Sequence, residues 1–130
     1  MIPEKSITIN GTEVALCYCA ATEIGYEKMS GKSSAVFVPR RIEDGEGGFK
    51  YIEPEAQTED YVMLALSAAV AQASRKCEKN NLTMEMVMYE AKPDDVKLLM
   101  TTVLELRNEW YDISPVVKPE IAQTEESTKN

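Results

Sequence analysis

The sequence predicts an α+β fold, in which an N-terminal β-hairpin and a second hairpin pack with a bundle of three to four helices. In the first half of the chain, short β-type segments alternate with turn-forming residues. In the second half, apolar residues recur at helical spacing. The chain has 130 residues, enough to bury roughly two-thirds of its surface without help from a metal or disulfides. We expect a single domain over residues 1–117 and a disordered polar tail over residues 118–130.

The N-terminal hairpin is predicted by the dipeptide Asn10-Gly11, which lies between two β-type segments. Residues 5–9 alternate between polar and apolar side chains and are rich in β-branched residues. Residues 12–17 resume the alternation after the turn. Asn-Gly between alternating segments is the strongest short-range signal for a two-residue hairpin turn.

A helix is expected over residues 20–29, with Thr22 as a possible N-cap. Gly25 lies inside this helix and costs about 1 kcal/mol of helix propensity relative to alanine. Gly31 follows the last periodic residue, where a residue in the left-handed conformation commonly ends a helix.

Residues 35–38 and 49–52 are predicted to be the strands of the second hairpin, and the glycine-rich acidic segment 43–48 is predicted to be its turn. Pro39 and Pro54 bracket this hairpin and favour edge strands, because proline cannot donate a backbone hydrogen bond. The sequence leaves open whether this hairpin joins the N-terminal sheet.

The clearest predicted helix begins at Thr58, which can serve as the N-cap, and the acidic residues 59–60 follow in its first turn. It ends before Asn80-Asn81. Its apolar residues recur at three- and four-residue spacing, typical of a helix with one buried face. This predicted stripe consists of Val62, Leu66, Ala69, Val70, Ala73 and Cys77.

Two further helices are expected. The first is short, is capped by Thr83, and places Met84 and Met88 on one core-facing side. Pro93 ends it, and residues 94–111 form the last long helix after an acidic start. Its predicted apolar face consists of Val96, Leu99, Met100, Val103, Leu104 and Leu106.

The charge and the absence of histidine exclude several classes of function. Fourteen basic and 22 acidic residues give a formal net charge of −8, and the chain has no histidine. This rules out imidazole general bases, serine–histidine or cysteine–histidine nucleophile pairs, and histidine-ligated metals. The acidic balance also disfavours binding to nucleic acid. We therefore expect no nucleic-acid partner.

The cysteines and the start of the chain predict a cytoplasmic protein with no membrane association. Cys17 and Cys19 are two residues apart and Cys77 is distant, which fits neither a disulfide framework nor a cysteine-only zinc site. The first two cysteines are expected to be core residues. The N-terminus lacks an apolar signal segment, and no apolar run approaches the ~18 residues of a membrane helix.

No catalytic, cofactor-binding or metal-ligating residues are predicted. The acidic segment 43–46 lacks the spacing of a calcium loop. The acidic pairs 59–60 and 94–95 lie at predicted helix starts, where the helix dipole accounts for them. Segment 45–48 has glycines but no lysine and hydroxyl residue to complete a phosphate-binding loop. An enzyme that uses only carboxylates and a metal is the less favoured alternative.

Candidate partner-binding residues come from two segments. Met86 does not share the helix face of its methionine neighbours and is expected to be partly exposed. Residues 110–117 concentrate aromatic and aliphatic side chains, which either complete the core or form a docking surface. The candidates are Met86, Trp110, Tyr111, Ile113, Val116 and Val117.

The order of these elements resembles that of the small tail assembly chaperones of long-tailed bacteriophages and prophages. The similarity rests on the strand–Asn-Gly–strand segment 7–14 and the helix end 26–32. It continues in the acidic helix start 58–61 and the leucine–threonine start at 82–83. Segment 32–57 departs from the family, because it is longer and more β-like than the usual connection between helices.

This resemblance implies a non-enzymatic protein that binds the hydrophobic tape-measure protein in the bacterial host cytoplasm before the tail tube polymerises. Proteins of this family are often acidic, self-associate and are absent from the finished virion, so a homo-oligomer is expected. In many phages a frameshift yields a longer product. The alternative is a small structural subunit of a phage tail or similar assembly, such as a tube or connector component.

Overall fold

The fold combines two separate β-sheets with helices, which confirms the predicted α+β class. The computed structural model describes residues 1–113 and 116–117. The tail predicted to be disordered, residues 118–130, lies outside the described residues. Within the described part, two hairpins and four α-helices are formed, together with one short 3-10 helix. None of these helices is long and apolar enough to cross a membrane.

The N-terminal hairpin pairs β1 (Glu4–Ile9) with β2 (Thr12–Cys17) in antiparallel register, as predicted. The turn residues Asn10 and Gly11 have φ angles of 51° and 76°. A two-residue turn that matches the twist of a hairpin requires positive φ at both positions, and Asn-Gly provides this with little strain. One face of the hairpin packs on the helices, with Ile7, Ile9, Val14 and Leu16 buried.

The next element, α1 (Ala20–Ser30), has the predicted bounds to within one residue but a different N-cap. Cys19 is the N-cap, and its backbone N–H donates to Thr22 Oγ1 over 3.2 Å. Thr22 is therefore the third helical residue, and its prediction as the N-cap is wrong. The reason is that Cys19 itself keeps an extended backbone as the chain leaves β2. Gly31 has φ 72° and ends the helix in the left-handed conformation, as predicted.

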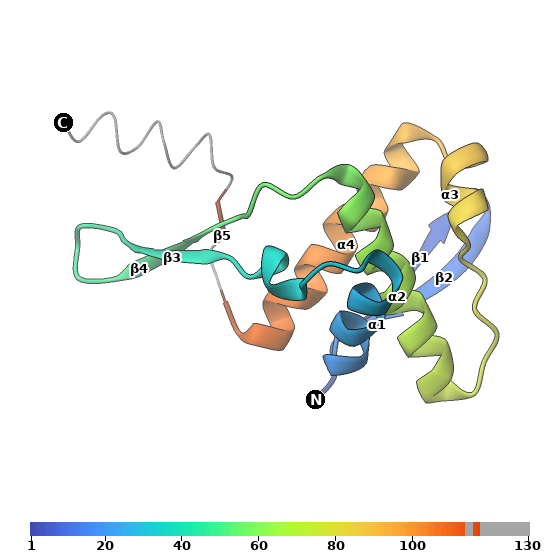
Figure 1. Cartoon of the computed structure of the whole chain (residues 1–130), viewed down its shortest axis with the longest axis horizontal. Coiled ribbons are helices and arrows are strands. Elements are labelled where there is room, and N and C mark those ends of the chain that lie inside the picture. Colours follow the sequence, from blue (N-terminus) through green and yellow to red (C-terminus); the bar gives the residue numbers. More distant parts are fainter. Residues whose placement is uncertain (114–115, 118–130) are drawn as a thin grey trace.

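The central element is α2 (Thr58–Lys76), which runs through the middle of the molecule (Figure 1). Every residue from 60 to 69 is buried, because α1, β2 and α4 pack against different sides of the helix. The prediction of a single buried stripe is therefore wrong in part, because two of its predicted members, Val70 and Cys77, are exposed. The N-cap is Gln57 rather than Thr58.

The short helix α3 (Met84–Tyr89) begins at Thr83, whose Oγ1 accepts a hydrogen bond from the Met86 N–H over 3.1 Å. This cap was predicted. Of the predicted core pair, Met84 is half-buried and packs against the core, but the prediction for Met88 is wrong, because Met88 is exposed. Val87 is the buried residue of this helix.

The last helix, α4 (Pro93–Tyr111), follows the predicted bounds closely. Asp95 in its first turn accepts the backbone N–H of Lys92 and also that of Asn10 in the N-terminal hairpin. The predicted apolar face is confirmed as the side that contacts the core. Its buried members are Leu99, Val103 and Leu106, and its half-buried members are Val96, Met100 and Leu104.

The second hairpin is present, but its first strand begins later than predicted. Residues 35–38 were expected to form its first strand, but residues 34–37 form a 3-10 turn, and β3 is Arg40–Glu43. Ser33 explains the difference, because its Oγ accepts the Ala35 N–H and starts the turn. The turn places Phe37 in the core, where its side chain is almost completely buried.

This hairpin does not join the N-terminal sheet. Strand β3 pairs antiparallel with β4 (Phe49–Ile52), and β4 pairs in parallel with the two-residue strand β5 (Val116–Val117). The resulting β3–β4–β5 sheet, called the arm below, extends away from the helices, while the N-terminal hairpin lies on the far side of the helical body (Figure 1).

Candidate interaction surface

The predicted partner-binding residues fall in two distant places. Met86 lies on α3, close to the start of α4, whereas Trp110 and Tyr111 lie at the end of α4 (Figure 1). The 19 residues of α4 span about 28 Å. Met86 is half-buried and packs against the core. The structure therefore does not bring Met86 together with the other candidates.

The end of α4 is half-exposed and tied to α1. The Trp110 residue is 38% exposed to solvent, and Tyr111 is 40% exposed. The Tyr111 hydroxyl donates to the Glu23 carboxylate, which also accepts the hydroxyl of the buried Tyr18. Partial burial, together with the hydrogen bond to Glu23, raises the pKa of Tyr111 to about 12. The Tyr111 hydroxyl is therefore fixed to α1, while part of each of the two side chains faces solvent.

The remaining candidates lie at the end of α4 and in the arm. Ile113 is half-buried, and its N–H donates to the Asn108 carbonyl over 3.0 Å, which closes the end of the helix. Val116 and Val117 pair with β4 as strand β5. The described candidates are thus divided between two places: Trp110, Tyr111 and Ile113 lie at the end of α4, and Val116 and Val117 belong to the arm.

Arg107 anchors the base of the arm, and sequence reasoning missed it. Its side chain is fully buried, and its five N–H donors are all used. Two donate to the Glu53 carboxylate over 2.7 and 2.6 Å, one to the Phe37 carbonyl, and two to the Asn108 side chain. A signal was available, because Arg107 follows Val103 by four residues and so continues the buried face of α4.

A row of aromatic rings supports the same base. Phe37 lies between Tyr26 and Tyr61, with ring centroids 4.8 and 5.4 Å away. The Tyr61 hydroxyl donates to the Pro54 carbonyl over 2.8 Å. Burial, and next the nearby charge of Glu53, raises the pKa of Tyr61 to about 12. The tyrosines therefore stay neutral and act as hydrogen-bond donors.

Asp60 is a buried carboxylate with two partners. It accepts the Tyr26 hydroxyl and the Lys32 ammonium, each over 3.0 Å. Burial alone would raise the pKa of Asp60, but the hydrogen bonds from Lys32 and Tyr26 outweigh it and hold the pKa below its usual value of 3.8. The same contact raises the pKa of Lys32.

We expect Asp60 to contribute to the acid stability of the protein. A carboxyl group whose pKa is lowered on folding adds stability above its unfolded pKa, and that stability is lost as the pH falls through the folded pKa. Asp60→Asn should cost about 1 kcal/mol at neutral pH and should flatten the loss of stability below pH 3.8. Thermal midpoints measured from neutral to strongly acidic pH check this. Parallel curves for the two proteins would contradict it.

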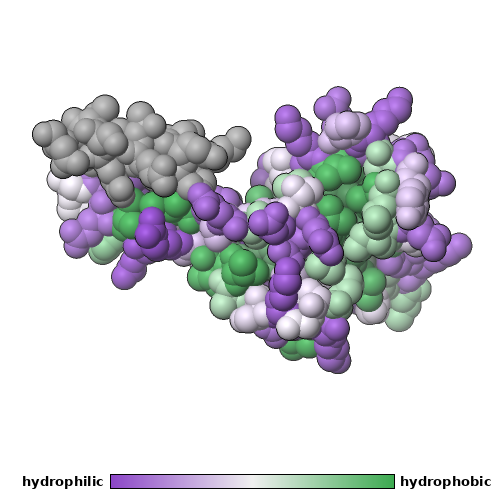
Figure 2. Space-filling model, turned by 45° about the horizontal axis from the view of Figure 1, so that its top comes forward, coloured by the Kyte–Doolittle hydropathy of each residue, from purple (hydrophilic) through white to green (hydrophobic). Residues whose placement is uncertain are grey.

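Around this anchored base, apolar side chains face solvent. Val36 and Val38 flank the buried Phe37, and Trp110 follows Arg107 by one helical turn. On the arm, Phe49 is 51% exposed. Hydrophobic surface is visible both on the arm and where it joins the helical body, with hydrophilic residues between (Figure 2). We call the set Val36, Val38, Trp110 and Tyr111 the junction surface. Phe49 lies apart from it, next to the turn of the hairpin.

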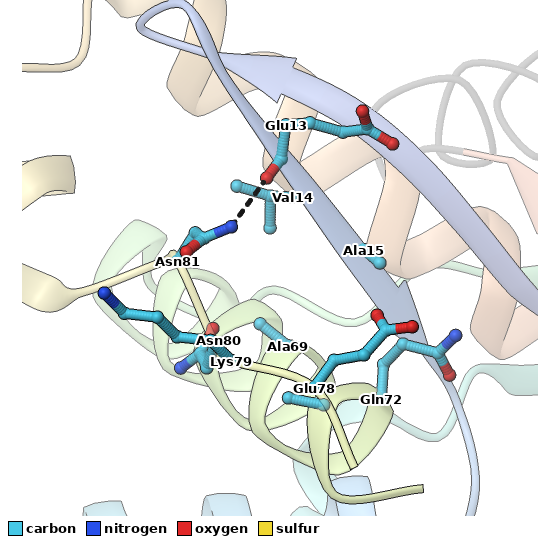
Figure 3. Close-up of a pocket in the computed structure, with 10 residues that line it drawn as sticks. Glu13, Val14, Ala15, Ala69, Gln72, Glu78, Lys79, Asn80 and Asn81 are labelled. Atoms are coloured by element: carbon cyan, nitrogen blue, oxygen red, sulfur yellow. Dashed lines mark hydrogen bonds between the residues drawn. The ribbon is translucent and has the colours of Figure 1, made fainter. Parts of the chain in front are cut away.

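A pocket lies between β2 and the end of α2. Its volume is about 200 Å³, and it is lined by residues 13–15 of β2, by α2, and by the segment 78–81 that follows α2 (Figure 3). Asn81 reaches across to the Glu13 carbonyl. Ligand pockets are usually about 300–1,000 Å³ and mostly apolar. This pocket is smaller, and its lining combines carboxylates, amides and a lysine with one valine and three alanines, so it does not indicate a cofactor site.

The cysteines and carboxylates of the described residues form no reactive cluster. Cys17 and Cys19 are buried next to Ala71, as expected of core residues, and all three cysteines are free. Burial, and next the neighbouring Cys19, raises the pKa of Cys17 to about 11, which keeps the thiol protonated. Within residues 1–113 and 116–117, no group of three or more cysteine, aspartate or glutamate side chains is placed to hold a metal ion.

Comparison of the chain with protein-family models, with curated proteins and with solved structures gives no match.

Proposed function

We propose that this protein acts by binding another protein and that the junction surface is its binding site. The observation that carries the proposal is the exposure of aromatic and aliphatic side chains around a rigid base. Val38 is 52% exposed and Trp110 38%, and the contact between Arg107 and Phe37 holds both segments in place. Exposed aromatic residues on a fixed backbone suit a protein interface, because little side-chain entropy is lost on binding.

For the particular role, we propose a tail assembly chaperone that binds the tape-measure protein and performs no catalysis. The resemblance in segments 7–14, 26–32, 58–61 and 82–83 supports this role. The formal charge of −8 also fits, because a strongly acidic surface would keep a complex with long apolar helices soluble. The junction surface would supply the apolar contacts.

Co-expression with a fragment of a tape-measure protein from a long-tailed phage tests this role. We expect the fragment to be soluble with the protein and to precipitate without it. A fragment that precipitates equally in both cases would overturn the chaperone role.

Three substitutions by serine test whether the junction surface is the binding site. Val38→Ser and Trp110→Ser should each reduce the amount of soluble fragment. Tyr89→Ser is the control, because Tyr89 is 81% exposed but lies on α3, near the start of α4 and far from the junction surface. Thermal midpoints would establish that the variants are folded. An equal effect of all three substitutions would argue against the junction surface.

The arm favours one alternative, a small structural subunit of a tail or similar assembly. Strand β3 is at the edge of its sheet in the described part of the chain, and such edges can pair with a neighbouring subunit. The two roles differ in whether the protein is present in the finished particle. A structural subunit stays in purified particles, whereas a chaperone is absent from them.

A further inference from the structure

The outer edge of β3 is a surface that the proposed chaperone role does not use. The sheet order is β3–β4–β5, and within residues 1–113 and 116–117 no strand pairs with the outer edge of β3. Arg40, Arg41 and Glu43 are exposed, and Ile42 is half-buried. An edge strand presents unpaired N–H and C=O groups, which can pair with a strand of another chain.

The hydrogen bond at the hairpin turn shows which residues of β3 direct their backbone N–H and C=O groups away from β4. The Asp44 N–H donates to the Gly48 carbonyl across the hairpin over 3.1 Å. In an antiparallel pair, the backbone groups of successive residues point alternately toward the partner strand and away from it. The backbone groups of Ile42 therefore face β4, and those of Arg41 and Glu43 face the outer edge.

This alternation restricts how a second β3 strand can pair. A two-fold antiparallel arrangement must match outward-facing residues with each other. One register centres on Ile42, so that Arg41 of each copy stands opposite Glu43 of the other and the two Ile42 residues face each other. The two neighbouring registers place Arg41 opposite Arg41, or Glu43 opposite Glu43. Like charges directly opposite are destabilising, so the charges select the first register.

The side chains of the arm suit this register. The guanidinium carbon of Arg41 lies 4.4 Å from the centroid of the Phe49 ring, which holds the side chain over the sheet. In the paired arrangement Arg41 would contact Phe49 within its own chain and Glu43 of the second copy. Ile42 would bury its side chain against its symmetry mate. The charge order from Arg40 to Asp44 is basic, basic, neutral, acidic, acidic, which is self-complementary about Ile42.

We propose that two copies of this chain associate through β3 in an antiparallel two-fold contact centred on Ile42, which joins the two arms into one continuous sheet. The paired strands have four residues each, so the contact is small and the dimer depends on protein concentration. This inference does not rest on the proposed function, because it needs no other protein.

Sedimentation velocity on the full chain over a series of concentrations tests the proposal. Wild-type protein should show a reversible monomer–dimer equilibrium. Arg41→Glu and Glu43→Arg should each raise the dissociation constant about tenfold or more, because each places like charges opposite each other twice. Glu46→Arg is the control for Glu43→Arg, since it makes the same change of charge in the exposed turn, outside the paired residues.

Restoring opposite charges across the contact is the decisive test. An equimolar mixture of R41E and E43R should form heterodimers, because glutamate then faces arginine at both positions. The double variant R41E/E43R should form homodimers again for the same reason. A wild-type protein that stays monomeric at all concentrations would overturn the proposal. A dimer that is insensitive to these substitutions, or variants that do not recover when mixed, would overturn it equally.

Discussion

Replacing Arg107 by methionine should lower the free energy of unfolding by about 3 kcal/mol. The substitution keeps much of the apolar volume but removes the whole buried guanidinium group. The Glu53 carboxylate would then lose both of its 2.6–2.7 Å hydrogen bonds, and the buried Phe37 carbonyl would lose its donor. Breaking one side of a buried ion pair is costly, because the remaining charge is left without compensation. Urea unfolding monitored by circular dichroism measures the change.

Two further variants separate the buried ion pair from a general effect of charge removal. Arg75 pairs with Glu4 over 3.0 Å, but both side chains are substantially exposed. Arg75→Met should therefore cost no more than about 1 kcal/mol. Adding Glu53→Met to Arg107→Met should recover part of the loss, because it removes the unpaired carboxylate. If Arg107→Met costs no more than Arg75→Met, Arg107 is not the anchor of the arm.

Replacing Gly25 by alanine should cost about 1–3 kcal/mol, although alanine is the better helix former by about 1 kcal/mol. A Cβ atom at position 25 would lie 2.2 Å from Ser67 Oγ and 3.4 Å from Ser67 Cβ. The Ser67 hydroxyl is buried and donates to the Thr22 carbonyl over 2.7 Å, so it cannot move without breaking that bond. Gly25 therefore allows α1 and α2 to approach closely.

A double-mutant cycle tests this explanation. Ser67→Ala alone removes one hydrogen bond and should cost about 1 kcal/mol. In the Ser67→Ala background, Gly25→Ala should be nearly neutral or stabilising, because the overlapping oxygen is absent and the gain in helix propensity remains. Additive losses of stability in the double variant would show that the two residues do not conflict. Thermal and urea unfolding both measure the changes in stability of the variants in this cycle.

The sequence alone determined the elements whose signals act over a few residues. Asn10-Gly11 formed the predicted hairpin, because this pair accepts positive φ at both turn positions. Gly31 ended α1 for the same conformational reason. Thr83 capped α3 through a hydrogen bond to an N–H three residues away. Such interactions depend on local backbone geometry and need no distant partner.

Where the prediction failed, a contact outside the segment decided the structure. Residues 35–38 have strand-forming side chains, yet the turn started by Ser33 allows Phe37 to pack between two tyrosines. Val70 was expected on a single buried stripe of α2, but it is exposed. The helix is instead buried on several sides, because three elements pack around it. Burial on this scale depends on which elements surround a helix, and periodicity along one segment does not carry that information.

The candidate site shows the same division. The sequence pointed to residues 110–117 by their aromatic and aliphatic composition. The structure places Trp110 and Tyr111 in the last turn of α4, and Val116 and Val117 in the arm. Composition did not reveal that Met86 lies at the other end of α4, or that Arg107 and Glu53 meet across 54 positions of the chain. A buried arginine is stable only when acceptors from several segments converge on it. Its environment is therefore decided by tertiary structure, whereas turns and helix ends were already determined by their own residues.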